Sequence, residues 1–185
     1  AFGNVGLKVE GEPLGADQYP LFFEVWGRKS PYGVVTVVPE SIPDKLKAFL
    51  VVGGNPLVSM PDSNAFREAF RKLDLLVVHD MFMTETAELA EMILPSCTFL
   101  ETTGLGSYTV QGNYGVPYIQ LRQKVIEPLG ESKTDWLIWS ELADYLGFGE
   151  HFPWRTDEEM LDMLVQPSGF NYEHFKNHPE GFMYR

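Results

Sequence analysis

The stretch Ala48-Phe-Leu-Val-Val-Gly-Gly-Asn-Pro56 decides the fold class, and Leu75-Leu-Val-Val-His-Asp80 repeats its pattern one element later. Each is a short apolar run without alternation, which is typical of a strand inside a parallel sheet that is covered on both faces. Open α/β sheets hold ligands at the carboxyl ends of their strands, where loop backbone and the last side chains line a crevice. The two runs therefore predict an α/β sheet with a binding site at its edge.

The turn after the first run has two interpretations. Gly53 and Gly54 allow a sharp turn and a close approach of the backbone to a ligand, and Asn55 offers both a donor and an acceptor. The same residues also fit a turn that has a purely structural role. Taken alone, they leave both interpretations open.

Residues 56–95 complete a strand–helix–strand unit and add a third strand. A helix is expected to begin near Asp62 or Ser63, because either side chain can cap its exposed amides. Thr84 is expected to cap a second helix. Residues 92–94 predict a short strand that Pro95 stops. Apolar residues recur at helical spacing in the first helix: Phe66, Ala69, Phe70 and Leu73.

Beyond residue 104 the pattern changes to a long loop and then to helices. The loop is expected over 105–128, with an extended piece at 118–126. A helix follows that Ser132 or Thr134 can cap and that Gly147 ends. Shorter helices are predicted at 157–165 and 172–176. The helix that Gly147 ends has an expected apolar face made of Trp136, Leu137, Trp139, Leu142, Ala143 and Leu146.

The chain divides into three expected parts. Residues 1–44 form an irregular segment that packs on the core, with a short aromatic helix near 19–26. Residues 45–148 form a Rossmann-like domain with a mostly parallel sheet flanked by helices, and residues 149–185 form a helical extension.

Composition excludes several classes of function. The formal net charge is −12 and no run of Lys or Arg is present, which argues against a nucleic-acid partner. The apolar runs are too short to insert into a membrane, and no targeting signal is predicted. Cys97 is the only cysteine, so the chain builds neither an internal disulfide nor a cysteine-rich metal or iron–sulfur site. We expect Cys97 to be a packed thiol.

Motifs follow one another in a fixed order between residues 45 and 148. As a series they resemble the molybdopterin oxidoreductases, the catalytic subunits of the dimethyl sulfoxide reductase family. The resemblance implies that the chain is an internal segment of a longer subunit and that residues 45–148 bind one of two molybdopterin guanine dinucleotides. The motifs are Gly-Gly-Asn-Pro at 53–56, Val-Val-His-Asp-Met-Phe-Met-Thr-Glu-Thr-Ala-Glu-Leu-Ala at 77–90, Ile-Leu-Pro at 93–95, Leu-Glu at 100–101 and Glu-Pro-Leu-Gly-Glu-Ser-Lys-Thr-Asp-Trp at 127–136.

The resemblance implies a molybdenum or tungsten oxidoreductase, in a family that includes formate dehydrogenases, nitrate reductases and thiosulfate reductases and that serves anaerobic respiration. The cofactor carries the two-electron chemistry, and the protein positions it. The family's iron–sulfur motif and metal ligand are absent from these residues, so this chain alone is expected to hold no cofactor and to show no turnover. Alternatives are a non-redox relative such as acetylene hydratase or transhydroxylase, a free-standing guanine nucleotide-binding module, or an interaction domain with docking segments at 22–26 and 152–154.

The resemblance also implies a set of cofactor-binding residues, and none that are catalytic or that ligate metal. Asp80 or Asp135 is expected to pair with the guanine N1–H and amino group, because one carboxylate satisfies both donors. Ser59 is expected to be a nearby hydroxyl contact. The full set is Gly54, Asn55, Ser59, His79, Asp80, Thr102 and Asp135.

Several of these residues have simpler structural interpretations. Asp135 fits the first turn of a helix through the helix dipole, and His79 fits a hydrogen-bonded structural histidine. Glu101 and Glu131 fit solvated loop acids. Relatives commonly have Asp where this chain has Glu91, and they carry an arginine in the stretch that corresponds to 104–115, where this chain has none.

The implied partners are the remaining domains of the parent subunit and an iron–sulfur electron-transfer subunit. An iron–sulfur cluster is expected in the amino-terminal part of that parent. The sequence does not distinguish a cytoplasmic from a periplasmic location.

Overall fold

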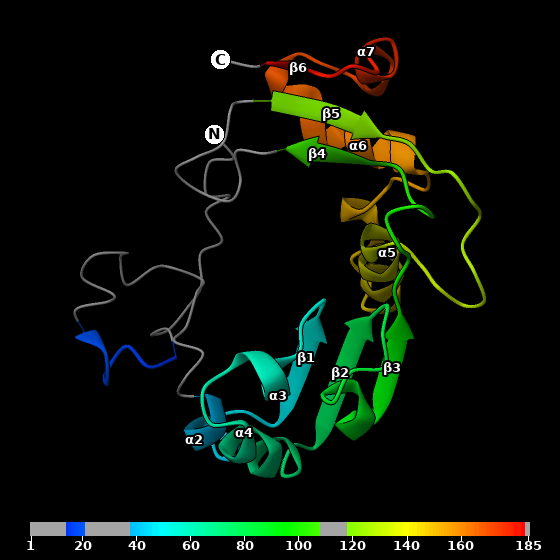
Figure 1. Ribbon diagram of the computed structural model, residues 1–185. Helices are drawn as coiled ribbons and strands as arrows, with labels where there is room; N and C mark the ends of the chain where they lie inside the picture. Colours follow the sequence, from blue (N-terminus) through cyan, green and yellow to red (C-terminus); the bar gives the residue numbers. More distant parts are fainter. Residues whose placement is uncertain (1–13, 21–37, 108–117, 184–185) are drawn as a thin grey trace. The chain divides into compact units, whose positions relative to one another are not determined.

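The computed structural model describes residues 14–20, 38–107 and 118–183 (Figure 1). The chain splits into two compact units, Ala1–Leu94 and Pro95–Arg185, and each is described by itself. The three-part division expected from the sequence stays a prediction, and most of the aromatic helix expected near 19–26 lies outside the described residues. No helix among the described residues is long and apolar enough to cross a membrane.

The first unit contains a three-stranded sheet in the order β1-β2-β3, with strands that run in the same direction (Figure 1). Strands β1 and β2 pair in parallel, from Ala48 opposite Leu75 to Val52 opposite His79. This arrangement confirms the predicted α/β class. The elements are α2 (Val38–Ser41), β1 (Ala48–Val52), α3 (Pro56–Ser59), α4 (Ser63–Phe70), β2 (Leu75–Asp80), the 3-10 turn η2 (Ala87–Leu89) and β3 (Met92–Pro95).

Helix α4 covers one face of this sheet. Asp62 is its cap, because the Asp62 carboxylate accepts the amide of Ala65 at 3.0 Å. Phe66 and Phe70 are 2% and 1% exposed, and their rings meet edge to face with centroids 5.7 Å apart. Phe70 also contacts the ring of Phe49 on β1, at 5.5 Å. The predicted apolar spacing thus builds the core of the unit.

The other face of β1 is exposed. Val51 points into the core and is 6% exposed, whereas Leu50 and Val52 are 42% and 45% exposed. The expectation that β1 is covered on both faces is therefore wrong for this structure, because its core cluster is built on the side where α4 lies.

The helix expected after Thr84 is shortened to the 3-10 turn η2. The Thr84 hydroxyl accepts the amide of Ala87 at 3.1 Å, so the predicted capping contact is present. The amide of Glu91, however, already donates to the carbonyl of Leu76 on β2 at 3.1 Å. Only one turn fits before the chain joins the sheet.

The second unit contains an antiparallel sheet that the sequence did not predict. Strands lie in the order β4-β5-β6, and Phe182 of β6 pairs with Ile119 of β5. Only the extended piece at 118–126 was expected; the helices at 157–165 and 172–176 are confirmed. The elements are β4 (Gly104–Ser107), β5 (Tyr118–Arg122), α5 (Asp135–Tyr145), η3 (Gly149–His151), α6 (Asp157–Val165), η4 (Gln166–Ser168), α7 (Tyr172–Lys176) and β6 (Phe182–Met183).

Helix α5 lies where it was predicted, but only part of its expected apolar face is buried. Thr134 stands at the cap position without a capping hydrogen bond from its side chain. The buried residues are Ile138, Ser140 and Ala143, of which only Ala143 was expected. Leu142 and Leu146, which were expected in the core, are 46% and 63% exposed. The buried side is the one that meets residues 152–155, where the Ser140 hydroxyl donates to the carbonyl of Phe152 at 3.2 Å.

Replacing Phe70 with alanine should destabilise the first unit by about 3–5 kcal/mol, because it leaves a cavity between α4 and β1. Urea unfolding followed by circular dichroism measures the loss. Tyr145→Ala is the control, since Tyr145 is 91% exposed. Equal free energies of unfolding for the two variants would contradict the packing described here.

Candidate cofactor-binding site

The turn after β1 is bonded directly to the end of β2. Gly53 has a left-handed backbone with φ 56°, and its amide donates to the carbonyl of His79 at 2.9 Å. A Cβ at Gly53 would meet no heavy atom within 4 Å, so main chain is accessible on that side. Glycine adopts this backbone conformation without strain. The two strand ends therefore form one edge with open backbone.

The Asn55 side chain joins this turn to the loop after β2. Its amide nitrogen donates to the Glu85 carboxylate at 2.7 Å, and its oxygen accepts from the Thr86 hydroxyl at 2.7 Å. The Thr86 hydroxyl also accepts the amide of Leu57 at 3.2 Å, and Thr86 is fully buried, 0% exposed. The bond from Asn55 is the largest cause that lowers the pKa of Glu85 below its usual value. Sequence reasoning singled out neither Glu85 nor Thr86.

Among the other predicted residues of the first unit, Ser59 ends α3, whereas His79 and Asp80 end β2. The Ser59 hydroxyl is exposed and donates to the carbonyl of Asn55 at 3.0 Å. Asp80 is half-buried, and its carboxylate accepts the amide of Phe82 at 3.0 Å. His79 is only 1% exposed. Ser59 and Asp80 are therefore accessible from solvent, whereas the side chain of His79 faces the interior.

Thr102 and Asp135 lie in the second unit. Thr102 is half-buried, and its hydroxyl is 3.5 Å from the carbonyl oxygen of Thr103. Asp135 is exposed, begins α5 and accepts the hydroxyl of Ser96 at 3.3 Å. Its place in the first turn suits a carboxylate because the helix dipole favours negative charge there.

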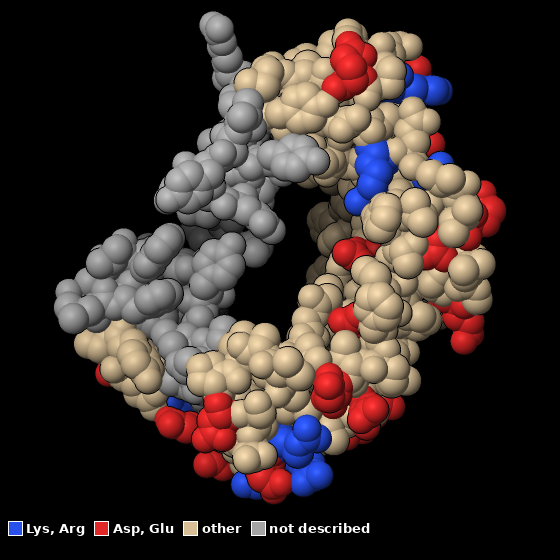
Figure 2. All heavy atoms as spheres, viewed as in Figure 1, with Lys and Arg blue, Asp and Glu red and all other residues tan. Residues whose placement is uncertain are grey.

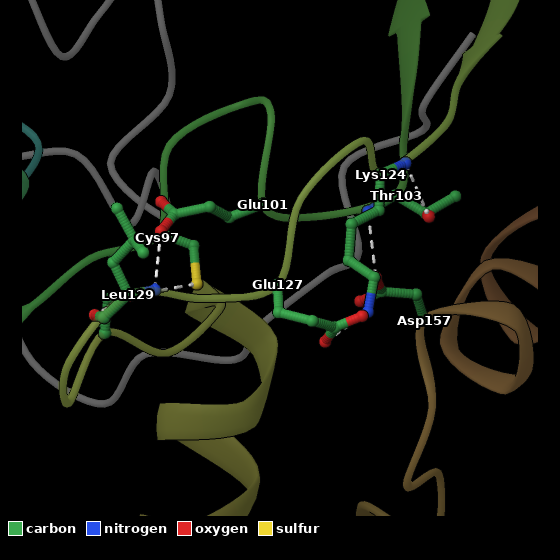
Figure 3. A network of polar contacts seen from close by, with 8 residues as sticks. Cys97, Glu101, Thr103, Lys124, Glu127, Leu129 and Asp157 are labelled. Atoms are coloured by element: carbon green, nitrogen blue, oxygen red, sulfur yellow. Dashed lines mark hydrogen bonds and ion pairs between the residues drawn. The ribbon is translucent and has the colours of Figure 1, made fainter.

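Glu101 is buried, so the expectation of a solvated loop acid is wrong for this residue. It is 3% exposed, and its carboxylate accepts the amide of Thr98 at 2.6 Å. It also accepts the amide of Leu129 at 2.7 Å (Figure 3). These bonds, the one from Thr98 first, hold the pKa of Glu101 below its usual value. Glu131 is exposed, as expected. Sequence alone gave no sign of this difference, because both acids lie in polar loops.

Asp157 is a second carboxylate that gathers distant segments. One of its oxygens accepts the amide of Thr103 at 2.8 Å (Figure 3). The other accepts the indole N–H of Trp136 at 2.7 Å. The amide of Lys124 in turn donates to the Thr103 hydroxyl at 3.2 Å. The sequence predicted a helix that begins at Asp157, but it did not predict the contacts of Asp157 with Thr103 and Trp136, because these join segments that are distant in sequence.

Both departures from the family pattern have structural counterparts. The Glu91 carboxylate accepts the amide of Leu76 at 2.6 Å and so satisfies a donor of β2. Where 104–115 lacks an arginine, Arg122 of β5 lies opposite Gly104, and a Cβ on Gly104 would be 2.9 Å from its Nη2 atom. Residues 108–117 lie outside the described part of the chain.

Cys97 is 8% exposed, which confirms the packed thiol. Burial is the main cause that raises its pKa, and its sulfur lies 3.8 Å from the Ser132 hydroxyl. Within the described ranges, no group of three or more His, Cys, Asp or Glu side chains is placed to hold a metal ion.

Comparison with known proteins gives a consistent picture. The family model for molybdopterin oxidoreductase matches residues 8–145. The F420-dependent formate dehydrogenase subunit alpha of Methanocaldococcus jannaschii is 34% identical, over 86% of this chain and 24% of that protein. The acetylene hydratase of Syntrophotalea acetylenica is 32% identical, over 80% of this chain and 20% of that protein.

A solved structure shows the same fold. Acetylene hydratase from Pelobacter acetylenicus superposes with a TM-score of 0.67 and 31% identity, covering 81% of this chain and 20% of that chain. The chain therefore spans a quarter or less of the length of these relatives.

Thr86→Val should destabilise the first unit by about 1–3 kcal/mol, because the isosteric change leaves the Leu57 amide and the Asn55 oxygen without a buried partner. Urea unfolding measures the change. Thr102→Val, at a half-buried hydroxyl, is the control and should change stability by less than about 0.5 kcal/mol. A Thr86 variant as stable as the control would contradict the proposed link.

Glu101→Gln should flatten the dependence of stability on acid pH. The folded pKa of Glu101 lies below that of an unfolded glutamate, about 4.3. Its contribution is therefore present above about pH 4.3 and is lost as the pH falls through the lower folded value. Free energies of unfolding between about pH 7 and about pH 3 test this. Glu131→Gln is the matched control and should keep the slope of the unchanged protein; identical slopes in both variants would refute the expectation.

Proposed function

The chain belongs to the molybdopterin oxidoreductase family, and we propose that it holds one molybdopterin guanine dinucleotide within a larger molybdenum or tungsten oxidoreductase. The matched part makes up only 20–24% of the length of these relatives. Activity and substrate accordingly belong to a parent enzyme in this proposal. The role of this chain is to bind and orient the cofactor.

One observation carries the proposal. The carboxyl ends of β1 and β2 are joined into a single edge by the bond from Gly53 to His79 and by the Asn55 side chain. This edge offers open glycine backbone, the Asn55 side-chain amide and the Asp80 carboxylate, and the exposed Ser59 hydroxyl lies at the end of the following helix, α3. Such a donor and acceptor set suits the hydroxyls, diphosphate and base of a dinucleotide, and strand ends are where open α/β sheets bind them.

Asp80 or Asp135 suits the guanine base. The Asp80 carboxylate accepts the amide of Phe82, and the Asp135 carboxylate accepts the hydroxyl of Ser96. The two oxygens of one carboxylate can accept the N1–H and the amino group of guanine as a pair.

When bound, the cofactor supplies two-electron transfer at its metal. The residues of this chain have a different role. The Asn55 amide and the Thr86 hydroxyl hold the β1 turn in place. The glycine backbone leaves room for the ligand, and Asp80 or Asp135 selects the base. Because the chain has a single, buried cysteine, we assign it neither the iron–sulfur motif nor the metal ligand, and we expect no turnover from the chain alone.

Acetylene hydratase, a non-redox relative, supports a second candidate. It matches this chain both in sequence, at 32% identity, and in structure, with a TM-score of 0.67. A parent enzyme that reduces no redox dye but adds water to an alkyne would favour this candidate. A free-standing guanine nucleotide-binding module would instead require tight nucleotide binding by the isolated chain.

We also propose that further domains of the parent cover the apolar surface of the first unit. Leu50 and Val52 are 42% and 45% exposed, and Phe82, in the loop after β2, is 71% exposed. Exposed apolar surface of this kind marks interfaces. An iron–sulfur electron-transfer subunit is a further proposed partner, on the family resemblance alone. Acidic side chains are widespread on the face shown in Figure 2, so we propose no nucleic-acid partner.

Asp80→Ala or Asp135→Ala should lower guanine dinucleotide retention in the full-length parent enzyme by about tenfold or more, because a charge-assisted contact is lost. The readout is the guanine nucleotide released from purified enzyme by acid. Asp74→Ala and Glu131→Ala remove exposed acids from the same units and should retain cofactor normally. Normal retention in both the Asp80 and the Asp135 variants would reject the assignment.

A further inference from the structure

Two segments of the second unit that are distant in sequence lie against each other around Glu101. The carbonyl of Leu100 accepts the amides of Val125 at 2.8 Å and Ile126 at 3.1 Å. Farther along, the amide of Cys97 donates to the carbonyl of Lys133 at 3.0 Å. Residues 95–103 and 124–135 are therefore held together at both ends by main-chain bonds.

Glu101 fills the middle of this junction. Its two carboxylate oxygens accept one amide from each segment, that of Thr98 and that of Leu129 (Figure 3). The carbonyl of Leu129 then accepts both the amide and the hydroxyl of Ser132, at 3.2 and 2.8 Å. The carboxylate thus fixes the start of the turn that leads to α5.

The two residues of this unit that we propose as cofactor contacts, Thr102 and Asp135, belong to these two segments. Thr102 follows Glu101 directly and precedes Thr103, whose amide is held by Asp157 at 2.8 Å. Asp135 comes two residues after Lys133, whose amide donates to the carbonyl of Pro95 at 3.1 Å. Thr102 therefore lies between Glu101, which is anchored through its own carboxylate, and Thr103, whose amide donates to Asp157. Asp135 lies two residues after Lys133, the last residue of its segment with a main-chain bond to the other segment.

We infer that Glu101 is a positioning residue for the cofactor: it fixes Thr102 and Asp135 relative to each other without contacting the ligand itself. The inference rests on the proposed function. A carboxylate is needed because both acceptors face amides, and these two amides belong to residues on different segments. A glutamine at this position would keep one acceptor and turn an N–H against the other amide. The lowered pKa of Glu101 agrees with a carboxylate that stays ionised.

Glu101→Gln in the full-length holoenzyme tests the inference. The rate at which guanine dinucleotide is lost should rise about tenfold, which corresponds to one hydrogen bond to a charged group. Phe175→Leu is the control for lost stability, because Phe175 is 2% exposed in the helical core of the same unit. Each enzyme is incubated at the same interval below its own melting temperature, so that a purely structural effect cancels.

Faster loss in the Glu101 variant than in the Phe175 variant supports the positioning role. Equal rates in the two variants overturn it. If the Asp80 and Asp135 variants also retain the dinucleotide normally, the proposed function itself fails; if they lose it while Glu101→Gln matches the control, only the inference about Glu101 fails.

Discussion

The loops of this protein depend on buried side-chain oxygens that satisfy main-chain amides. A loop at the end of a strand has no neighbouring strand to pair with, yet a buried amide without an acceptor is costly. In the first unit the Thr86 hydroxyl accepts the amide of Leu57, and in the second Glu101 accepts those of Thr98 and Leu129. These few contacts set the loop geometry on which any ligand site would stand.

Elements that arise from local pattern could be predicted from the sequence. The apolar run at 48–52 gave β1, and the spacing of Phe66 and Phe70 gave α4 and its core face. The antiparallel sheet could not be predicted, because its strands are short and β6 pairs with a strand about sixty residues earlier. The expected apolar face of α5 was confirmed only at Ala143, because the segment 152–155 that contacts this helix is brought there by tertiary packing.

Some residues around the candidate site could be selected from the sequence and others could not, because only local pattern is visible in a sequence. Asn55 and Asp80 stand where apolar runs end, so position along a strand was enough to select them. Glu101 and Glu131 looked alike in sequence, since both are acids in polar loops. In the structure, however, Glu101 is buried and accepts the amide of Leu129 from a segment that is distant in sequence. Its role depends on residue 129, and no spacing rule connects the two.

The uncovered side of β1 has a consequence for how such a protein is made. Leu50 and Val52 remain in contact with water after the first unit has formed its core. Exposed apolar strand surface of this kind promotes aggregation while a longer polypeptide is still being synthesised. The yield of soluble material would then depend on how soon a covering segment emerges from the ribosome, and chaperones would be needed most during that delay.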